Sequence, residues 1–225
     1  MDDLPPEPPS APRDHAGASP LMLARLLAGR LCHDLMSPAS GIVSGLDFLD
    51  DPGGEEMRAE AMRLIASSAR KLMDLLVFYR VAVGGYAEGE TFDTAQLRTL
   101  TEGIFAHVRP SLDWAVDASA LSGEAARALL NLAQIAAGAL ALGGVARISV
   151  RRENGRLAIV AEADGPRARL QPEVAAGLRG EPLGEGLAGR WVQPFCLHAQ
   201  LAAVGGTVGA ETGESGILFT AILAG

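Results

Sequence analysis

Two long amphipathic helical patterns, separated by one break, constrain the fold of this chain more than any other feature. Ser19-Pro20 is typical of a helix start, and apolar residues then recur at helical spacing to about Leu49. Asp50–Gly54 interrupts the pattern, and a second helix is predicted from Glu55 to about Val83. The apolar positions of the first helix are Leu23, Leu27, Leu31, Leu35, Ile42, Leu46 and Leu49, and those of the second are Met57, Ala61, Leu64, Ile65, Leu72, Leu75, Leu76 and Tyr79, with Ser68 among them.

Two such helices joined by a short turn form an antiparallel hairpin, whose remaining apolar surface needs a partner. The usual solution is a second copy of the hairpin, which gives a four-helix bundle across a dimer axis. We therefore expect residues 19–84 to form a dimerisation domain. Residues 1–18 hold five prolines and few apolar residues, which predicts a disordered tail.

The remaining residues, 85–225, alternate between helix and strand patterns. Ser122 is placed to cap a helix, and the Asn154-Gly155 pair between two apolar runs predicts a β-hairpin. A further helix is expected from about Ala188 to Val204, followed by two closing strands. The order predicts helices on one face of a mixed sheet, an α/β sandwich, so the whole chain is predicted to be α+β.

Charge and composition exclude several classes of protein. The net charge is −8 and Lys71 is the single lysine, which argues against a nucleic-acid-binding role because phosphate backbones require clustered cations. The N-terminus lacks the basic and apolar segments of a signal peptide, and no apolar run reaches the length of a membrane span. We expect a cytoplasmic protein in which Cys32 and Cys196 do not form a disulfide.

His33 is predicted to lie on the exposed side of the first helix. At 100° per residue it is about 160° from Leu31 and Leu35 and about 180° from Ile42. Its own face is mostly small, whereas a solvated face usually carries Glu, Lys and Gln, so we expect this face to let a partner protein approach. Its members are Leu26, Gly29, Arg30, Ser37, Ser40 and Ser44.

The run Cys32-His33-Asp34-Leu35-Met36-Ser37-Pro38 resembles the H-box of sensor histidine kinases. In that motif the phosphorylated histidine is followed at once by an acid and five residues later by proline. The resemblance implies that His33 is a phosphoryl-accepting nucleophile and that Asp34 is the acid that orients it. The spacing alone places Arg30 one turn earlier, where it could balance phosphoryl charge.

The downstream sequence resembles the ATP-binding domain of the same kinases but departs from it at the nucleotide site. Asn131 matches the start of the N-box, but the second asparagine of that box, a magnesium ligand, is replaced by Ile135. Asp164-Gly165 lacks the second glycine of the G1 box, and Gly184–Leu187 is a weak G2 candidate. We therefore expect no nucleotide, metal or other cofactor to bind to this chain.

A histidine hairpin joined to a degenerate kinase-like sandwich resembles the dimeric histidine phosphotransferases of the ChpT type over residues 20–225. That family implies a place in an alphaproteobacterial cell-cycle phosphorelay. The donor would be the receiver domain of a CckA-type hybrid kinase and the acceptors CtrA-type and CpdR-type response regulators, with Mg²⁺ held by the receiver. Two alternatives remain open: an ATP-using histidine kinase core and a non-catalytic dimeric adaptor.

Overall fold

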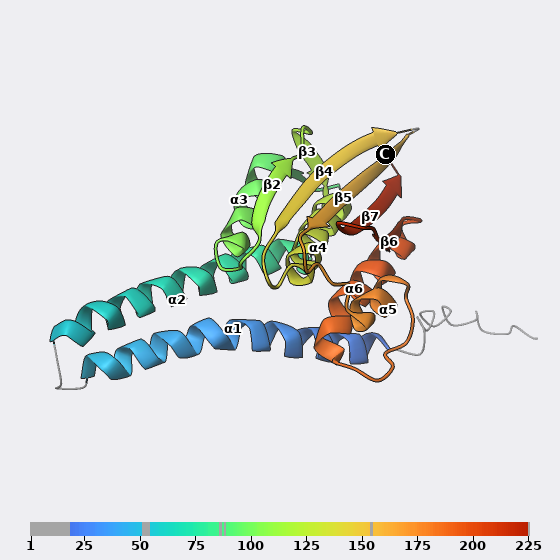
Figure 1. The fold of residues 1–225 in the computed structure, drawn as a ribbon. Helices are drawn as coiled ribbons and strands as arrows, with labels where there is room; N and C mark the ends of the chain where they lie inside the picture. The colour runs from blue at the N-terminus through green and yellow to red at the C-terminus, as the bar shows by residue number, and fades with distance from the viewer. Residues whose placement is uncertain (1–18, 51–54, 86, 88, 154, 225) are drawn as a thin grey trace, which may run out of the picture.

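The computed structural model describes residues 19–50, 55–85, 87, 89–153 and 155–224. The predicted disordered tail at residues 1–18 and most of the predicted break at Asp50–Gly54 lie outside these residues. Within them the fold is α+β, a helical hairpin followed by an α/β sandwich, as the sequence predicts (Figure 1).

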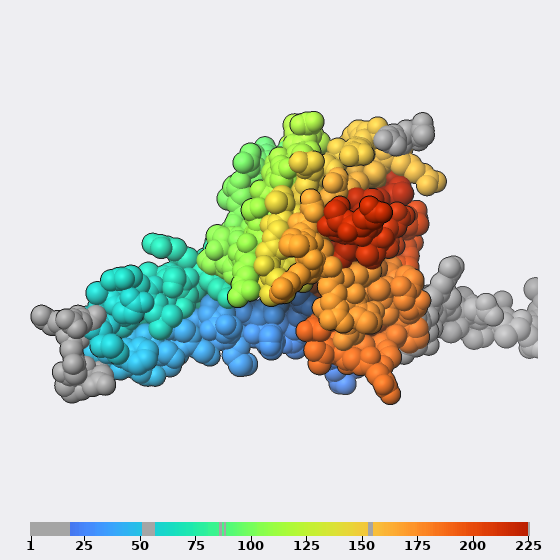
Figure 2. Space-filling view, in the orientation of Figure 1, coloured from blue at the N-terminus to red at the C-terminus, as the bar shows by residue number. Residues whose placement is uncertain are grey.

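The hairpin consists of α1 (Pro20–Asp50) and α2 (Glu55–Ala82), which pack along each other. The Ser19 hydroxyl accepts a hydrogen bond from the Met22 amide at 3.2 Å, so the predicted N-cap is present. The end of the hairpin near Asp50 projects well beyond the sandwich, whereas the other end lies under it (Figure 2).

Two glycines inside α1 allow the helices of the hairpin to approach closely. A Cβ at Gly41 would lie 3.3 Å from the Cβ of Ser68, and one at Gly45 would lie 2.5 Å from Cγ1 of Ile65 and 3.1 Å from the Ala61 carbonyl oxygen. A glycine in a helix costs about 1 kcal/mol relative to alanine. Here that cost is offset by packing that a side chain would prevent.

Gly45→Ala should therefore destabilise the protein although alanine is the better helix former. Overpacking of this kind typically costs ~1–3 kcal/mol. Gly29→Ala is the matched control, because no atom lies within 4 Å of its added Cβ, and it should stabilise the helix by up to ~1 kcal/mol. Urea unfolding of the two variants measures the difference, and a Gly45→Ala protein as stable as Gly29→Ala would contradict this packing.

The sandwich contains a five-stranded mixed sheet in the order β2-β4-β5-β7-β6 and a two-stranded sheet of β1 and β3. In the larger sheet β2 pairs with β4 in parallel and all other pairs are antiparallel. The β4–β5 hairpin closes with Glu153 paired to Arg156, and Gly155 has a φ of +72°, as the Asn154-Gly155 signal predicts. The strands are β1 (Thr91–Asp93), β2 (Ser111–Ala115), β3 (Ala120–Ser122), β4 (Val145–Glu153), β5 (Arg156–Asp164), β6 (Thr207–Thr212) and β7 (Gly216–Ala224).

Four helices complete the sandwich, and two of them begin at a side-chain N-cap, of which Ser122 is the predicted one. Asp93 caps α3 (Thr94–Phe105) and Ser122 caps α4 (Gly123–Ala139), each with a side-chain oxygen that accepts a backbone amide hydrogen bond. The other two are α5 (Pro172–Leu178) and α6 (Ala188–Ala203). The sequence reading missed β3 and α5, both of which are short.

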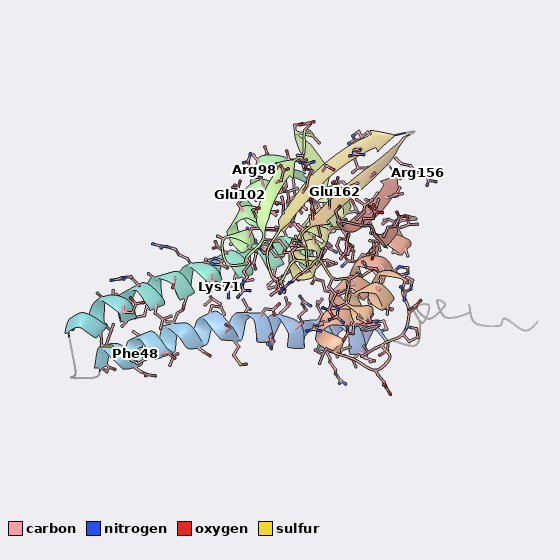
Figure 3. The ribbon with its side chains drawn as sticks, viewed as in Figure 1. Phe48, Lys71, Arg98, Glu102, Arg156 and Glu162 are labelled. Carbon is pink, nitrogen blue, oxygen red and sulfur yellow. The ribbon has the colours of Figure 1, made fainter. Side chains whose placement is uncertain are left out.

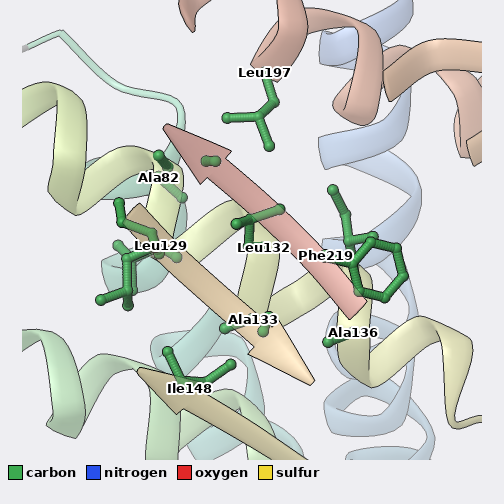
Figure 4. Packing of buried hydrophobic residues seen from close by; sticks show 14 of the residues in the cluster. Ala82, Leu129, Leu132, Ala133, Ala136, Ile148, Leu197 and Phe219 are labelled. Carbon is green, nitrogen blue, oxygen red and sulfur yellow. The ribbon is translucent and has the colours of Figure 1, made fainter. Parts of the chain in front are cut away.

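Helix α4 forms the centre of the core. Leu129, Leu132 and Ala136 lie on it, and Ile148 of β4 and Phe219 of β7 lie around them (Figure 4). On the surface of the domain, Arg98 and Glu102 of α3 form an exposed ion pair one helical turn apart (Figure 3). This core also includes Phe78, Tyr79 and Ala82 from the end of α2, so the hairpin and the sandwich share buried contacts.

Several hairpin residues predicted to point inward are exposed in the single chain. Leu46, Met57 and Leu76 are 49%, 52% and 44% exposed. Two helices in contact cover only one side of each other, so a single hairpin does not bury these apolar positions. Large apolar side chains therefore remain on the surface of the hairpin, including Met36, Val43, Met62 and Met73.

Candidate functional site

His33 lies on α1 with 88% of its side chain exposed, which confirms its predicted orientation. Its Nδ1 atom is 3.1 Å from Oδ1 of Asp34, the next residue. A carboxylate can only accept a hydrogen bond, so it selects the tautomer in which Nδ1 carries the proton. The lone pair of Nε2 is then free and faces solvent, where another molecule can reach it.

The second oxygen of Asp34 is held by α2. The Tyr79 hydroxyl donates a hydrogen bond to Oδ2 of Asp34 at 2.5 Å, and Nε of Arg30 lies 3.6 Å from the same oxygen. Burial raises the pKa of Tyr79 to about 12, with the hydrogen bond to Asp34 adding to the shift. The phenol therefore remains a protonated donor throughout the physiological pH range.

The sandwich continues this hydrogen-bond chain. Nε2 of Gln134, on α4, donates to the Tyr79 hydroxyl at 2.9 Å. Nε2 of Gln193, on α6, donates to Oε1 of Gln134 at 2.6 Å. Four helices thus contribute to one chain that ends at Asp34, beside His33.

Asn131, the residue that matches the start of the N-box, is occupied by structural contacts. Its Nδ2 donates to the carbonyl oxygens of Ala82 at 2.8 Å and Arg127 at 2.9 Å, and its Oδ1 accepts from Gln193 at 3.0 Å. The side chain is 3% exposed. It therefore joins the end of α2 to the sandwich instead of facing a ligand.

A groove of about 510 Å³ lies beside His33, between the hairpin and the sandwich. Lys71 of α2 lines it (Figure 3), as do Arg109 and His107 from the segment after α3. Nε2 of His107 is 2.7 Å from Oδ2 of Asp74. Among the charged side chains that line the groove, Arg30, Lys71 and Arg109 are cationic and Asp34 is anionic, so the net charge of the groove suits an anionic partner surface.

The predicted partner-binding residues differ in their surroundings, and Leu26 is described separately below. Gly29, Ser37, Ser40 and Ser44 are exposed on the face of His33. Arg30 is only 21% exposed, and its guanidinium donates a hydrogen bond to the Gly189 carbonyl oxygen at the start of α6.

Leu26 departs from the prediction that it lies on an open face. It is half-buried and packs against a small apolar cluster formed by Trp191, Val192 and Phe195 of α6. A helical wheel of α1 alone places Leu26 near His33, but α6 covers that part of α1. Leu26 therefore anchors α1 to the sandwich.

Sequence reasoning did not find Tyr79 as a site residue, nor Gln134, Gln193 or the groove residues. Tyr79 was assigned to the core, and it is 6% exposed, so its burial was predicted although its contact with Asp34 was not. His107 also lies in the groove beside His33, although its helical sequence context does not distinguish it from an ordinary histidine. Tyr79 occupies an apolar position of its helical pattern, so the sequence around it indicates burial but not a hydrogen bond to Asp34.

A second cavity of about 190 Å³ lies between α4, α5 and α6 and is lined by Ile135, Arg169 and Arg190. It is smaller than the ~300–1,000 Å³ of most small-molecule sites. Across the ranges that the structure describes, no three His, Cys, Asp or Glu side chains gather into a candidate metal site. Over the same ranges, no helix is long and apolar enough to cross a bilayer.

An exposed histidine beside an aspartate that holds its ring, on a helical hairpin joined to an α/β sandwich, is the arrangement of a histidine phosphotransfer protein. The family model for the histidine phosphotransferase C-terminal domain matches residues 94–216, more than half of the chain, and the chain belongs to this family.

Protein phosphotransferase ChpT and one solved structure agree with this assignment. Protein phosphotransferase ChpT from Brucella abortus (strain 2308) is 28% identical over 204 residues, which cover 90% of this chain and 96% of that protein. A solved structure described as a bacterial phosphotransferase matches with a TM-score of 0.79 and 29% identity, over 90% of this chain and 97% of its own. The catalytic domain of the histidine kinase ThkA has a TM-score of 0.49 and 16% identity, over 61% of this chain and 96% of its own.

Proposed function

We propose that this histidine phosphotransferase carries the phosphoryl group on Nε2 of His33 as an intermediate of a two-component phosphorelay. One observation supports this most strongly: the imidazole is 88% exposed while its Nδ1 atom is held by Asp34. A histidine that is merely exposed on a helix does not require a carboxylate fixed beside it. Here the Asp34 carboxylate is itself held in place by a hydrogen bond from the Tyr79 hydroxyl.

The chemistry follows from this geometry. The lone pair of Nε2 attacks the phosphorus of an aspartyl phosphate on the donor, the N–P bond forms, and the P–O bond to the donor carboxylate breaks in line with it. The proton on Nδ1 stays in place, so the phosphorylated ring carries a positive charge. The Asp34 carboxylate at 3.1 Å stabilises that charge.

The second step reverses the first on another partner. An aspartate of the acceptor attacks the same phosphorus, the N–P bond breaks, and neutral His33 returns. Lys71 and Arg109 in the groove are placed to attract the acidic pocket of a receiver, and Gly29, Ser37, Ser40 and Ser44 let its surface approach the imidazole.

The partners we propose are those of ChpT-type proteins. The donor is the receiver domain of a CckA-type hybrid kinase, and the acceptors are CtrA-type and CpdR-type response regulators of a cell-cycle phosphorelay. Mg²⁺ is held by the acidic pocket of the receiver, because carboxylate oxygens are the ligands this ion prefers. The exchange takes place in the cytoplasm.

We propose a homodimer formed through the hairpin, which completes a four-helix bundle. Met36, Val43 and Leu46 of α1 recur at intervals of seven and three residues, and Met62, Met73 and Leu76 of α2 at eleven and three, so each set lies on one side of its helix. All six are at least 44% exposed in the single chain, and a second hairpin would bury them.

ATP should not bind measurably to the sandwich. Ile135 offers no oxygen for magnesium, Asn131 is committed to Ala82, Arg127 and Gln193, and the cavity beside them is small. Titration calorimetry with Mg-ATP checks this and should give no heat of binding up to millimolar nucleotide. A micromolar affinity that depends on magnesium would revive the kinase alternative.

One labelling experiment separates the three candidate functions. The purified protein is incubated with labelled ATP alone, and separately with the receiver domain of a CckA-type hybrid kinase that carries labelled phosphate. A phosphotransferase takes up label only from the receiver, a kinase takes it up from ATP, and an adaptor takes it up from neither.

A further inference from the structure

We infer that Tyr79 and Gln134 are positioning residues for His33, through which the sandwich domain sets the tautomer of the imidazole. This inference rests on the proposed function. It concerns a hydrogen-bond chain that runs from α6 through α4 and α2 to α1, and it assigns the degenerate sandwich a part in the reactivity of the hairpin.

Every hydrogen bond in this series is donated in the direction of Asp34. Gln193 donates to Gln134 at 2.6 Å, Gln134 donates to the Tyr79 hydroxyl at 2.9 Å, and Tyr79 donates to Asp34 at 2.5 Å. Hydrogen bonds aligned in series polarise one another, and the last one ends on a charged acceptor, where such bonds are strongest. The chain therefore fixes one oxygen of Asp34 and directs the other at Nδ1 of His33.

The hydrogen-bond chain begins in the protein interior, at Gln193. Gln193 is 4% exposed, and its amide also donates to Asn131 at 3.0 Å, which in turn holds the carbonyl oxygens of Ala82 and Arg127. Because these groups are buried and mutually satisfied, a shift of Tyr79 would leave a polar atom without a partner. The position of the Asp34 carboxylate is therefore set by the sandwich as well as by α1.

The consequence for the reaction is that Asp34 stays in place while the ring gains positive charge. Without the Tyr79 hydroxyl, the carboxylate of Asp34 keeps Arg30 at 3.6 Å but loses its hydrogen-bond donor on Oδ2. The Asp34 carboxylate can then rotate about its side-chain bonds, and water competes with it for the hydrogen bond to Nδ1 of His33. Neutral His33 would spend more time with the proton on Nε2, where no lone pair is available for attack.

The test is Tyr79→Phe, which removes one oxygen atom and keeps the ring. In protein labelled with ¹⁵N, long-range proton–nitrogen correlation spectra at a pH where His33 is neutral report which ring nitrogen carries the proton. We expect the Nδ1–H form to dominate in the wild-type protein and to fall in Tyr79→Phe. Phosphoryl uptake from a labelled receiver should slow by about ten- to a hundredfold, the range that corresponds to a lost hydrogen bond to a charged group.

Two further variants separate positioning from stability. Thr101→Val is the matched control, because Thr101 is fully buried on α3 and its hydroxyl donates only to the Leu97 carbonyl oxygen in its own helix. Thr101→Val should lower the free energy of unfolding about as much as Tyr79→Phe does, and it should leave the His33 tautomer and the transfer rate unchanged. Gln134→Met removes the next donor and should shift the tautomer in the same direction as Tyr79→Phe, by a smaller amount.

The outcomes are distinct. A wild-type tautomer in both Tyr79→Phe and Gln134→Met, or an equal change in Thr101→Val, overturns the inference. A wild-type protein that takes up no label overturns the proposed function instead, and the tautomer spectra still decide whether the chain positions His33.

Discussion

His33→Ala should take up no phosphoryl group from a phosphorylated receiver, because alanine offers no nucleophile. The side chain is 88% exposed, so its removal should change the free energy of unfolding by no more than ~0.5 kcal/mol and should leave the oligomeric state unchanged. Label that is stable to base and labile to acid, the signature of a phosphoramidate, should be present on the wild-type protein and absent from the variant.

The controls use the other histidines. His198 lies on α6 with Nδ1 3.0 Å from the Leu178 carbonyl oxygen, and His198→Gln keeps a donor at that position. His15 lies outside the residues that the structure describes. His198→Gln and His15→Ala should take up label like the wild-type protein. If His33→Ala still accepts acid-labile label, the assignment of the reaction to His33 is wrong.

Met73→Glu should convert the dimer into monomers without unfolding the hairpin. Met73 is 57% exposed in the single chain, so a charge there costs little within one protomer. In the proposed bundle the residue is buried, and each dimer would contain the unpaired charge twice, at ~2 kcal/mol or more per copy. The dissociation constant should therefore rise by roughly a thousandfold.

Light scattering over a range of protein concentrations measures this change, with circular dichroism to confirm that the helices remain. Ser67→Glu is the control, because Ser67 is exposed on α2 about 120° around the helix from Met73. It should remain dimeric. A wild-type protein that is monomeric at micromolar concentration, or a Met73→Glu protein as dimeric as Ser67→Glu, would contradict a dimer through this face.

The parts of the fold that could be predicted are those with local signals. Ser19 and Ser122 each cap a helix, and Gly155 lies in the tight turn of the β4–β5 hairpin, as the residues around them indicate. The exposure of His33 followed from the spacing of leucines on its own helix. Each of these features depends on residues a few positions apart, where helix and turn geometry is fixed.

The support for His33 depends on residues far apart in the sequence. The hydrogen bonds from Tyr79 to Asp34, from Gln134 to Tyr79 and from Gln193 to Gln134 span 45, 55 and 59 residues. No periodicity within one helix indicates which of its polar residues meets a partner on another. The burial of Leu26 was missed for the same reason, since it depends on where α6 docks.

The most direct test of the account is a relay assay with substoichiometric protein. A labelled donor receiver of the CckA type and an unlabelled acceptor receiver of the CtrA type are mixed with Mg²⁺ and with one-twentieth of an equivalent of the wild-type protein or of His33→Ala. We predict that label reaches the acceptor in amounts far above the amount of wild-type protein, through a transient acid-labile species on that protein, and that His33→Ala transfers none. Equal transfer with the two proteins, or label that never reaches the acceptor with the wild-type protein, would contradict a phosphorelay through His33.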